Sequence, residues 1–415
     1  MPGGSGRTII PLRRQPPAST DEIGFRRPPP LALYVHVPWC VRKCPYCDFN
    51  SHALSADSKM PREPAAIPER EYLAALLGDL ESALPLVWGR RVDSVFLGGG
   101  TPSLLSGAAV DELLAAVRSR LPLLPNAEIT LEANPGTIER EKFAAFRAAG
   151  VNRLSLGIQS FNPHHLESLG RIHDGHQAKT AIVEAIRYFD NFNLDLMYGL
   201  PGQALTEAVE DIDLALSFAP PHLSCYQLTI EANTAFAARP PALPDADDCA
   251  DMQDAIEAKL AAAGYRHYET SAFAQPGREC RHNLNYWHFG DYLGIGAGAH
   301  SKLTLRDRVL RQMRWKRPEQ YLVKVAAGTP LQEEFAVDPA DLPGEFMMNA
   351  LRLIDGFAAP LFATRTAWSL RSIEKQLQQA EKEGLLERRG EHIAPTDRGR
   401  RFLNRLLQGF LAERA

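Results

Sequence analysis

Short runs of apolar and β-branched residues alternate with amphipathic stretches through the first half of the chain. Runs such as LALYVHV at 31–37 and RLSLGIQ at 153–159 have the length and composition of buried strands, and the segments between them have helical spacing. This alternation predicts βαβ units, and therefore a parallel sheet covered by helices in an α/β protein. Strands are predicted at 31–37, 92–99, 128–134, 153–159, 193–199 and 222–228, and helices near 70–85, 107–120, 138–149, 175–189 and 204–218.

Six such units predict a curved, incomplete barrel, a partial (β/α)6 TIM-like arrangement, with a seventh strand near 265–273. An open doubly wound sheet is the alternative. After about residue 335 the pattern changes to helical segments near 342–355 and 368–383, a hairpin through Gly390 and a last helix from Thr396, which predicts a small C-terminal α+β domain of the winged-helix type. The predicted organisation is a tail at 1–30, a barrel with its extension at 31–300, a connector at 301–334 and the C-terminal domain at 335–415.

The first 30 residues differ from the rest of the chain. They hold seven prolines, five arginines and two acidic residues, with no apolar signal region and no helical periodicity. We therefore expect a flexible tail. The chain contains no run of 18 or more apolar residues, so the sequence predicts no membrane-spanning helix.

Composition sets broad limits on function. The 415 residues are 45% hydrophobic and 23% charged, as in ordinary globular proteins, and the formal net charge is only -4. Nucleic acid is not an expected partner, because the basic excess in the last segment, 365–415, is small and is typical of solvated helix faces. Cys225, Cys249 and Cys280 are widely spaced, which indicates reduced thiols and a cytoplasmic location.

Three closely spaced cysteines follow the first predicted strand. Cys40, Cys44 and Cys47 lie within the stretch PWCVRKCPYCDFN. Closed electron-transfer clusters use four cysteines and structural zinc sites use four Cys or His ligands, so three thiolates in one loop favour a 4Fe-4S cluster with one open iron. A zinc site completed by His36 or His52 is the alternative.

Polar residues and glycines gather where the predicted strands end. Gly98–Gly100 and Thr101 follow the second strand, Glu132 ends the third, Gln159 the fourth, and Asp195 lies in the fifth. Parallel β/α folds bind ligands at the carboxyl edge of the sheet, so these side chains are expected to converge. Each feature alone also suits a tight turn or a helix cap.

The CxxxCxxC spacing, with Tyr46 before the third cysteine, resembles the signature of the radical S-adenosylmethionine (SAM) superfamily. The resemblance implies a radical-SAM barrel in which the open iron of the 4Fe-4S cluster binds the amino and carboxylate groups of SAM. It also implies SAM contacts from residues at the strand ends, namely Tyr34, Tyr46, Gly99, Gly100, Thr101, Glu132, Gln159, Arg171 and Asp195.

Five further motifs, YVHVPWC, GGGTPS, EANP, GIQSF and DLMYGLPGQ, are similar to those of the oxygen-independent coproporphyrinogen III oxidase group. The resemblance covers about residues 31–300. Members that carry out the oxidative decarboxylation have a fourth cysteine two residues after the third, where this chain has Phe49. This difference puts that enzymatic activity in doubt.

The segment His282-Asn283-Leu284-Asn285-Tyr286-Trp287 is similar to the HNxxYW motif of the heme chaperones in this group. The resemblance implies heme as a ligand, with His282 as the axial ligand and Tyr286 and Trp287 around it. His288, His300 and Cys280 are competing ligands, and a core role for His282 is the structural alternative. The neighbouring GIGAG segment is expected to allow close backbone packing rather than to bind a nucleotide.

These patterns together predict a protein that binds a 4Fe-4S cluster, SAM and heme and passes heme to apo-hemoprotein clients. The resemblance implies clients of the respiratory-chain type, met by peripheral contact with a membrane, and leaves a homodimer open. One alternative is an oxygen-independent coproporphyrinogen III dehydrogenase. The other is a metal-stabilised winged-helix regulator.

Overall fold

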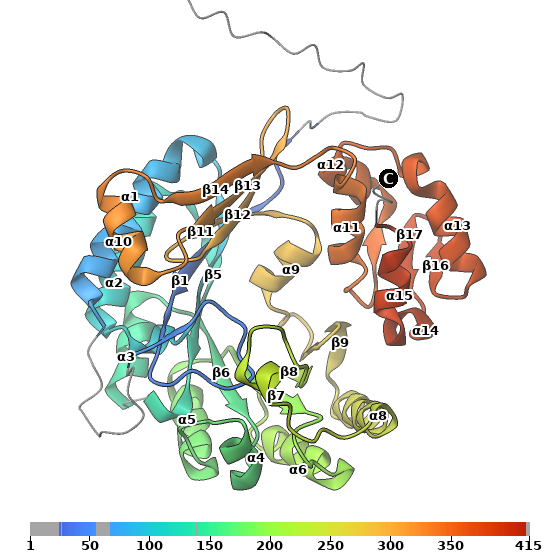
Figure 1. Cartoon of the computed structure of the whole chain (residues 1–415), viewed down its shortest axis with the longest axis horizontal. Coiled ribbons are helices and arrows are strands. Elements are labelled where there is room, and N and C mark those ends of the chain that lie inside the picture. Colours follow the sequence, from blue (N-terminus) through green and yellow to red (C-terminus); the bar gives the residue numbers. More distant parts are fainter. Residues whose placement is uncertain (1–24, 26, 55–66, 138–139, 412–415) are drawn as a thin grey trace, which may run out of the picture.

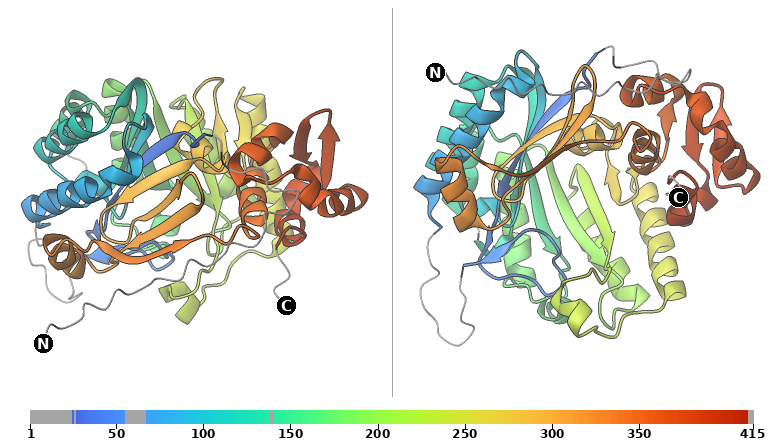
Figure 2. Two further views of the ribbon diagram at one scale, coloured as in Figure 1. Left: turned by 90° about the horizontal axis from the view of Figure 1, so that it is seen from above. Right: turned by 45° about the horizontal axis from the view of Figure 1, so that its top comes forward.

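The computed structural model describes residues 25, 27–54, 67–137 and 140–411. Its main body is a strongly curved, mixed sheet of 12 strands with helices packed on the convex face (Figures 1 and 2). Most of the predicted tail at 1–30 lies outside the described residues. Within it, Phe25 packs against the apolar core of the C-terminal domain.

The six predicted strands form the parallel centre of this sheet and follow one another in sequence order. Because the order never reverses, every crossover runs the same way and leaves its helix on the same face, so the doubly wound alternative is wrong. The strands are β1 (Leu31–Val37), β4 (Val92–Gly99), β5 (Leu123–Ala133), β6 (Arg153–Gln159), β7 (Phe192–Tyr198) and β8 (His222–Gln227), and the helices between them are α1 (Glu69–Val87), α2 (Gly107–Arg120), α3 (Arg140–Ala149), α5 (Gly175–Tyr188) and α6 (Leu205–Leu216).

Alternation along each strand separates the core from the functional face. In β1, Leu33 and Val35 are fully buried in the main apolar core, and Tyr34 and His36 point to the opposite, concave face. The same period of two places Glu132 of β5 and Asp195 of β7 on the concave face. The strand pattern therefore carries apolar side chains to the helices and polar side chains to the site.

The predicted seventh strand is a hairpin. Its two short strands, β9 (Arg266–Glu269) and β10 (Ala272–Ala274), pair antiparallel, and β10 pairs antiparallel with β8. The helices α7 (Ala235–Ala238) and α8 (Ala246–Ala262) precede it. The hairpin extends the sheet without closing a barrel, because the two edge strands of the sheet are β9 and β14.

The segment predicted as a connector, 301–334, belongs to the main sheet. Strand β11 (Asp291–Ile295) pairs parallel with the free side of β1, and three antiparallel strands follow it outward. These are β12 (His300–Thr304), β13 (Val309–Arg314) and β14 (Leu331–Ala336), with α10 (Pro318–Ala326) before the last. Their polar sequences, such as LQEEFA in the exposed strand β14, lack the apolar runs that predict buried strands.

The C-terminal domain has its own apolar core and a small three-stranded sheet, as the winged-helix-type prediction requires. Gly390, at the predicted hairpin turn, has a φ of 62°. The helix predicted at 342–355 ends at 350, and the one predicted at 368–383 is a 3-10 turn followed by a helix. The elements are α11 (Leu342–Ala350), β15 (Phe357–Ala358), α12 (Ala359–Thr366), η3 (Leu370–Ile373), α13 (Glu374–Lys382), β16 (Leu386–Arg389), β17 (His392–Pro395), α14 (Asp397–Arg401) and α15 (Leu403–Gln408).

Helix α9 (Arg281–Trp287) lies between the main sheet and the C-terminal domain (Figure 1). It contacts β1, β4 and β11 on one side and α11 on the other. In the described part of the chain, no helix is long and apolar enough to cross a bilayer.

Candidate functional site

The cysteine loop leaves the carboxyl end of β1 and is closed by a short parallel pair, β2 (Trp39–Cys40) and β3 (His52–Ala53). The Lys43 ammonium ties the loop together by donating to the carbonyl oxygens of Phe49 at 3.1 Å and Ser51 at 3.2 Å. The Asn50 amide anchors it from outside through the carbonyl of Ala297 at 2.9 Å. All three cysteines are partly exposed and none forms a disulfide.

Each cysteine sulfur has a polar neighbour. The Thr101 hydroxyl donates to Cys40 Sγ at 3.5 Å, and the Arg171 guanidinium donates to Cys44 Sγ at 3.7 Å. Cys47 Sγ lies 3.6 Å from the hydroxyl of Ser51. Donors of this kind stabilise thiolates and tune the potential of an iron-sulfur cluster. The three thiols therefore fit the predicted 4Fe-4S ligands.

The zinc alternative relied on His36 or His52. Both ring nitrogens of His36 are already used, since Nδ1 accepts from the Tyr34 hydroxyl at 3.0 Å and Nε2 donates to the Asn50 carbonyl at 2.9 Å. Burial lowers the pKa of His36 to about 4, so the imidazole is neutral. Among the described residues, no three His, Cys, Asp or Glu side chains lie close enough to share a single ion. A cubane does not require such closeness, because each thiolate binds a different iron.

The glycine turn after β4 packs against the protein itself. Gly99 has a φ of 113°, and a Cβ at this position would collide with the His36 ring. At Gly100 a Cβ would collide with the Trp39 carbonyl, and the Gly100 and Thr101 amides donate to Val37 and Trp39. The lack of side chains at Gly99 and Gly100 therefore lets the turn pack against the base of the cysteine loop, and the contact of these glycines with SAM stays a prediction.

Two partly buried carboxylates, Glu132 and Asp195, lie on the concave side of the sheet. Glu132 accepts from the Gly99 amide at 3.1 Å, and Asp195 accepts from Ser155 at 3.1 Å and Asn193 at 2.8 Å. Burial, with repulsion from Asp195, raises the pKa of Glu132 to about 7, and burial also raises the pKa of Asp195. No described cation forms a salt bridge with either. A pair of partly buried carboxylates suits a cationic ligand with hydroxyl groups, such as SAM.

Arg171 and Gln159 close the opposite side. The Arg171 guanidinium donates to Asn134 Oδ1 and to the Gly157 carbonyl, and its Nε is buried without a partner. Gln159 has a φ of 69°, an unusual conformation for a residue other than glycine and one that is typical of functional sites. Tyr46 packs against Phe236 at a ring separation of 6.5 Å. Arg171 contacts the cysteine loop at Cys44 and Tyr46 lies within that loop, so these residues fit the predicted SAM contacts.

Two polar residues next to these contacts were missed by sequence analysis. Asn134 donates to Thr101 at 2.9 Å and accepts from Arg171, so it links the glycine turn to the arginine. Asn193 bridges Asp195 and Ser155 at 2.8 Å each. The signal for Asn193 was its position two residues before Asp195, which puts both on the concave face.

The heme-motif residues occupy different sides of α9. His282 is 2% exposed, its Nδ1 lies 2.9 Å from the Ser94 hydroxyl, and its ring stacks on Phe96 at 4.9 Å. Tyr286, one turn later, packs edge-on to it at 5.1 Å. Trp287 instead lies under the Arg352 guanidinium at 4.6 Å. Tyr286 thus packs against His282, whereas Trp287 faces the C-terminal domain.

Glu128 of β5 holds the start of α9. Its carboxylate accepts from the amides of Arg281 and His282, each at 3.1 Å, and from the Cys280 thiol at 3.5 Å. Burial raises the pKa of Cys280 to about 12, which keeps the thiol protonated. Burial also lowers the pKa of His282 to about 3. His282 and Cys280 are therefore neutral groups in the interior, and the assignment of His282 as a heme ligand stays a prediction.

Comparison with known proteins relates both domains to described families. The radical SAM superfamily model matches residues 34–215, and the HemN C-terminal domain model matches residues 337–402. The heme chaperone HemW of Escherichia coli is 48% identical over 387 residues, which are 93% of this chain and 99% of that protein. The HemW of Mycobacterium tuberculosis is 36% identical over 96% of this chain and 99% of its own length.

Two further comparisons extend the relationship. A bovine protein named radical S-adenosyl methionine domain-containing protein 1, mitochondrial, is 34% identical over 90% of this chain and 86% of its own length. Among solved structures, the coproporphyrinogen III oxidase HemN of Escherichia coli superposes with a TM-score of 0.77 at 24% identity, covering 93% of this chain and 91% of that chain. This match supports the fold.

Proposed function

Because this chain belongs to the HemW family of heme chaperones, within the radical SAM superfamily, we propose that it binds heme and passes it to apo-hemoproteins. The observation that carries the proposal is 48% identity with a heme chaperone over 93% of this chain and 99% of the relative. The helix with the heme motif, α9, lies beside the C-terminal domain and supports the same conclusion.

The cofactors implied by the family are a 4Fe-4S cluster and SAM. Cys40, Cys44 and Cys47 would hold three irons of the cluster, and the fourth would accept SAM. When bound, the cluster supplies a single electron at low potential. Glu132 and Asp195 would accept hydrogen bonds from the ligand, and Arg171 would pair with its carboxylate while holding Cys44.

The rival enzymatic function is the decarboxylation of coproporphyrinogen III. The fold match to HemN is the observation in favour of this alternative, because both chains share the barrel and the C-terminal domain. Against it stands Phe49, which replaces the extra cysteine and is 65% exposed at the rim of the cysteine loop. The family relationship gives no support to the alternative of a winged-helix regulator.

We further propose a cytoplasmic location, with clients among respiratory-chain hemoproteins reached by peripheral contact with a membrane. The relation to bacterial heme chaperones supports this proposal. A homodimer is compatible with this proposal. Analytical sedimentation with and without heme measures the oligomeric state.

A paired assay on one anaerobically reconstituted preparation tests the proposed function. Titration with hemin is expected to give a saturable Soret band, and heme-loaded protein is expected to restore the spectrum of an apo b-type cytochrome. The same preparation, given coproporphyrinogen III, SAM and a reductant, is expected to form no protoporphyrinogen IX.

Two results would contradict the proposal. One is steady turnover of coproporphyrinogen III, which would identify an oxidase. The other is a hemin titration no different from that of a protein without heme sites, such as bovine chymotrypsinogen, because a chaperone must bind its cargo before it can deliver it.

A further inference from the structure

The heme-motif histidine is poorly placed to meet a heme. His282 is 2% exposed and is enclosed by Phe96, Tyr34 and Tyr286, at ring separations of 4.9, 6.4 and 5.1 Å. Its Nε2 is buried without a hydrogen-bond partner. A macrocycle with four pyrrole rings reaches this nitrogen only if the aromatic residues around it move apart.

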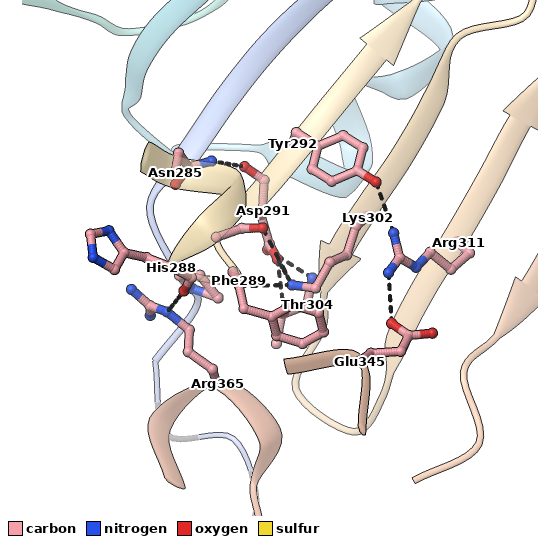
Figure 3. Close-up of polar contacts among 12 residues, drawn as sticks. Asn285, His288, Phe289, Asp291, Tyr292, Lys302, Thr304, Arg311, Glu345 and Arg365 are labelled. Carbon is pink, nitrogen blue, oxygen red and sulfur yellow. Dashed lines mark hydrogen bonds and ion pairs between the residues drawn. The ribbon is translucent and has the colours of Figure 1, made fainter. Parts of the chain in front are cut away.

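His288, directly after α9, has an accessible imidazole. The residue is partly buried, and within the described part of the chain neither ring nitrogen forms a hydrogen bond, whereas its amide caps the helix by donating to the Leu284 carbonyl at 2.9 Å. Burial and the nearby Arg365 guanidinium lower the pKa of His288, so the imidazole is neutral, the form that binds iron. Its ring points away from the buried Asp291 and Lys302 (Figure 3).

Two guanidinium groups of the C-terminal domain flank this end of α9. Arg365, on α12, donates from Nε to the His288 carbonyl at 3.1 Å, and its guanidinium lies on the same side as the His288 ring (Figure 3). Arg352, just after α11, lies over the Trp287 ring at 4.6 Å with its Nε buried and unpartnered. Neither forms a salt bridge with a described carboxylate.

The two carboxylates that interact electrostatically with these arginines do not form salt bridges with them. Asp291, which acts on Arg365, is fully buried and already bonds to Lys302 at 3.1 Å and Arg90 at 2.8 Å. Glu269, which acts on Arg352, is itself 4% exposed, and burial raises its pKa to about 7. The guanidinium groups therefore keep hydrogen-bonding capacity for an added carboxylate.

Heme presents the complementary chemistry: an iron that accepts an imidazole, a flat apolar face and two propionates. We propose that heme docks at the junction of α9 and the C-terminal domain, with His288 as the axial ligand, Trp287 against the porphyrin and Arg352 and Arg365 on the propionates. This inference rests on the proposed function and changes its ligand from His282 to a residue that solvent reaches. Charge-assisted pairs between arginine and carboxylate are the strong, directional kind.

The placement also gives His282 a role. Buried between the sheet and Tyr286, and bonded to Ser94, it holds α9 against β4 and so positions Trp287 and His288. Heme at this junction would touch both domains, and the ligand at the surface would leave the far coordination position of the iron open to an acceptor protein.

The axial ligand is tested by His288→Cys and His288→Ala, with His176→Ala, at an exposed position of α5, as the control. All three are loaded with hemin, reduced and exposed to carbon monoxide. The expected result is a red-shifted Soret band of the thiolate type only in His288→Cys, because a thiolate alters the band only when it ligates the iron. His288→Ala is expected to lose the carbonyl spectrum of imidazole-ligated ferrous heme, and His176→Ala to keep it.

The propionate contacts are tested with hemin and its dimethyl ester, which lacks both carboxylates. Arg352→Gln and Arg365→Gln are expected to weaken hemin binding about tenfold or more each, and to leave binding of the ester unchanged. Arg389→Gln, at an exposed strand end with a 79% exposed side chain, is the control and is expected to change neither.

The outcomes separate this inference from the proposed function. If the unmodified protein binds no hemin, the proposed function fails. If it binds hemin but His288→Cys and His288→Ala keep its spectra, or His282→Gln alone removes the imidazole-ligated carbonyl spectrum with the fold intact by circular dichroism, the assignment of His288 is overturned and the chaperone function stands. Equal losses for hemin and ester in the arginine variants would refute the propionate contacts.

Discussion

Glu132 shows how one partly buried side chain can link ligand binding to protonation. It accepts a hydrogen bond from the Gly99 amide, while Asp195 repels its charge. Its pKa is raised from 4.5 to about 7. A cationic ligand placed between the two carboxylates would favour the charged form and lower this pKa.

We therefore predict that SAM binding releases a proton below about pH 7, because Glu132 is then protonated before the ligand arrives. Calorimetry of SAM binding in buffers with different ionisation enthalpies measures the release. Glu132→Gln is expected to reduce it. Glu269→Gln removes a carboxylate with a similarly raised pKa outside the predicted SAM contacts, and should leave the release unchanged.

The same residue makes a prediction for stability without ligand. Between pH 4.5 and about 7 the folded state keeps a proton on Glu132 that the unfolded state has lost, so the free energy of unfolding falls as pH rises through this window. Glu132→Gln is expected to make the total decrease in the free energy of unfolding across this window smaller, by at most about 3 kcal/mol. Urea unfolding at several pH values measures it, and an unchanged slope in the variant would count against the raised pKa.

At the scale of elements, the turn after β4 and the cysteine loop form one unit. Gly99 combines a φ of 113° with contact against the His36 ring, and His36 in turn bonds to the Asn50 carbonyl of the loop. A side chain at Gly99 would push the ring and, through it, the loop that carries the cluster ligands.

We predict that Gly99→Ala lowers the iron content of the reconstituted protein severalfold. The control is Gly328→Ala, because Gly328 also has a positive φ, 72°, but a Cβ there meets nothing within 4 Å. The control isolates backbone strain, which costs about 1 to 2 kcal/mol and should not affect iron content. Equal iron loss in both variants would show that strain, not the collision with His36, is responsible.

For the whole molecule, Asp79 joins the parallel strands to the antiparallel extension. This fully buried carboxylate of α1 accepts from the Gly296 amide at 3.1 Å, from Arg314 of β13 at 3.2 Å and from the Tyr321 hydroxyl of α10 at 3.0 Å. Ala297, next to Gly296, holds Asn50 of the cysteine loop. The extension thus supports the cofactor site from the far side of β1.

Asp79→Asn is expected to lower the free energy of unfolding by about 3 to 5 kcal/mol, because Arg314, 1% exposed, is left buried without its counter-ion. Equilibrium denaturation measures the loss. The exposed pair of Asp307 and Arg308 is the control, since Asp307→Asn should cost less than about 1 kcal/mol. Similar losses in the two variants would mean that Asp79 is not a structural hub.

The parallel half of the protein follows from its sequence, which also predicts the cluster ligands. Strands such as 31–37 and 153–159 are read correctly because burial on a sheet demands local apolar runs, and the cysteine spacing is local too. The convergence of Glu132, Gln159 and Asp195 followed because parallel strands end at one edge. The family resemblance, carried by short motifs, was confirmed by the comparisons.

Contacts between residues that are far apart in the sequence could be known only from the folded protein. The strands of the segment 301–334 are stabilised by neighbours such as Asp79, more than 200 positions away, so their own polar sequences gave no signal. The contact between the glycine turn and His36 also joins residues far apart in the sequence. The same is true of the side chains that enclose His282 but not His288. A residue's type and spacing set what it can do chemically, whereas its burial depends on side chains that the fold brings from elsewhere.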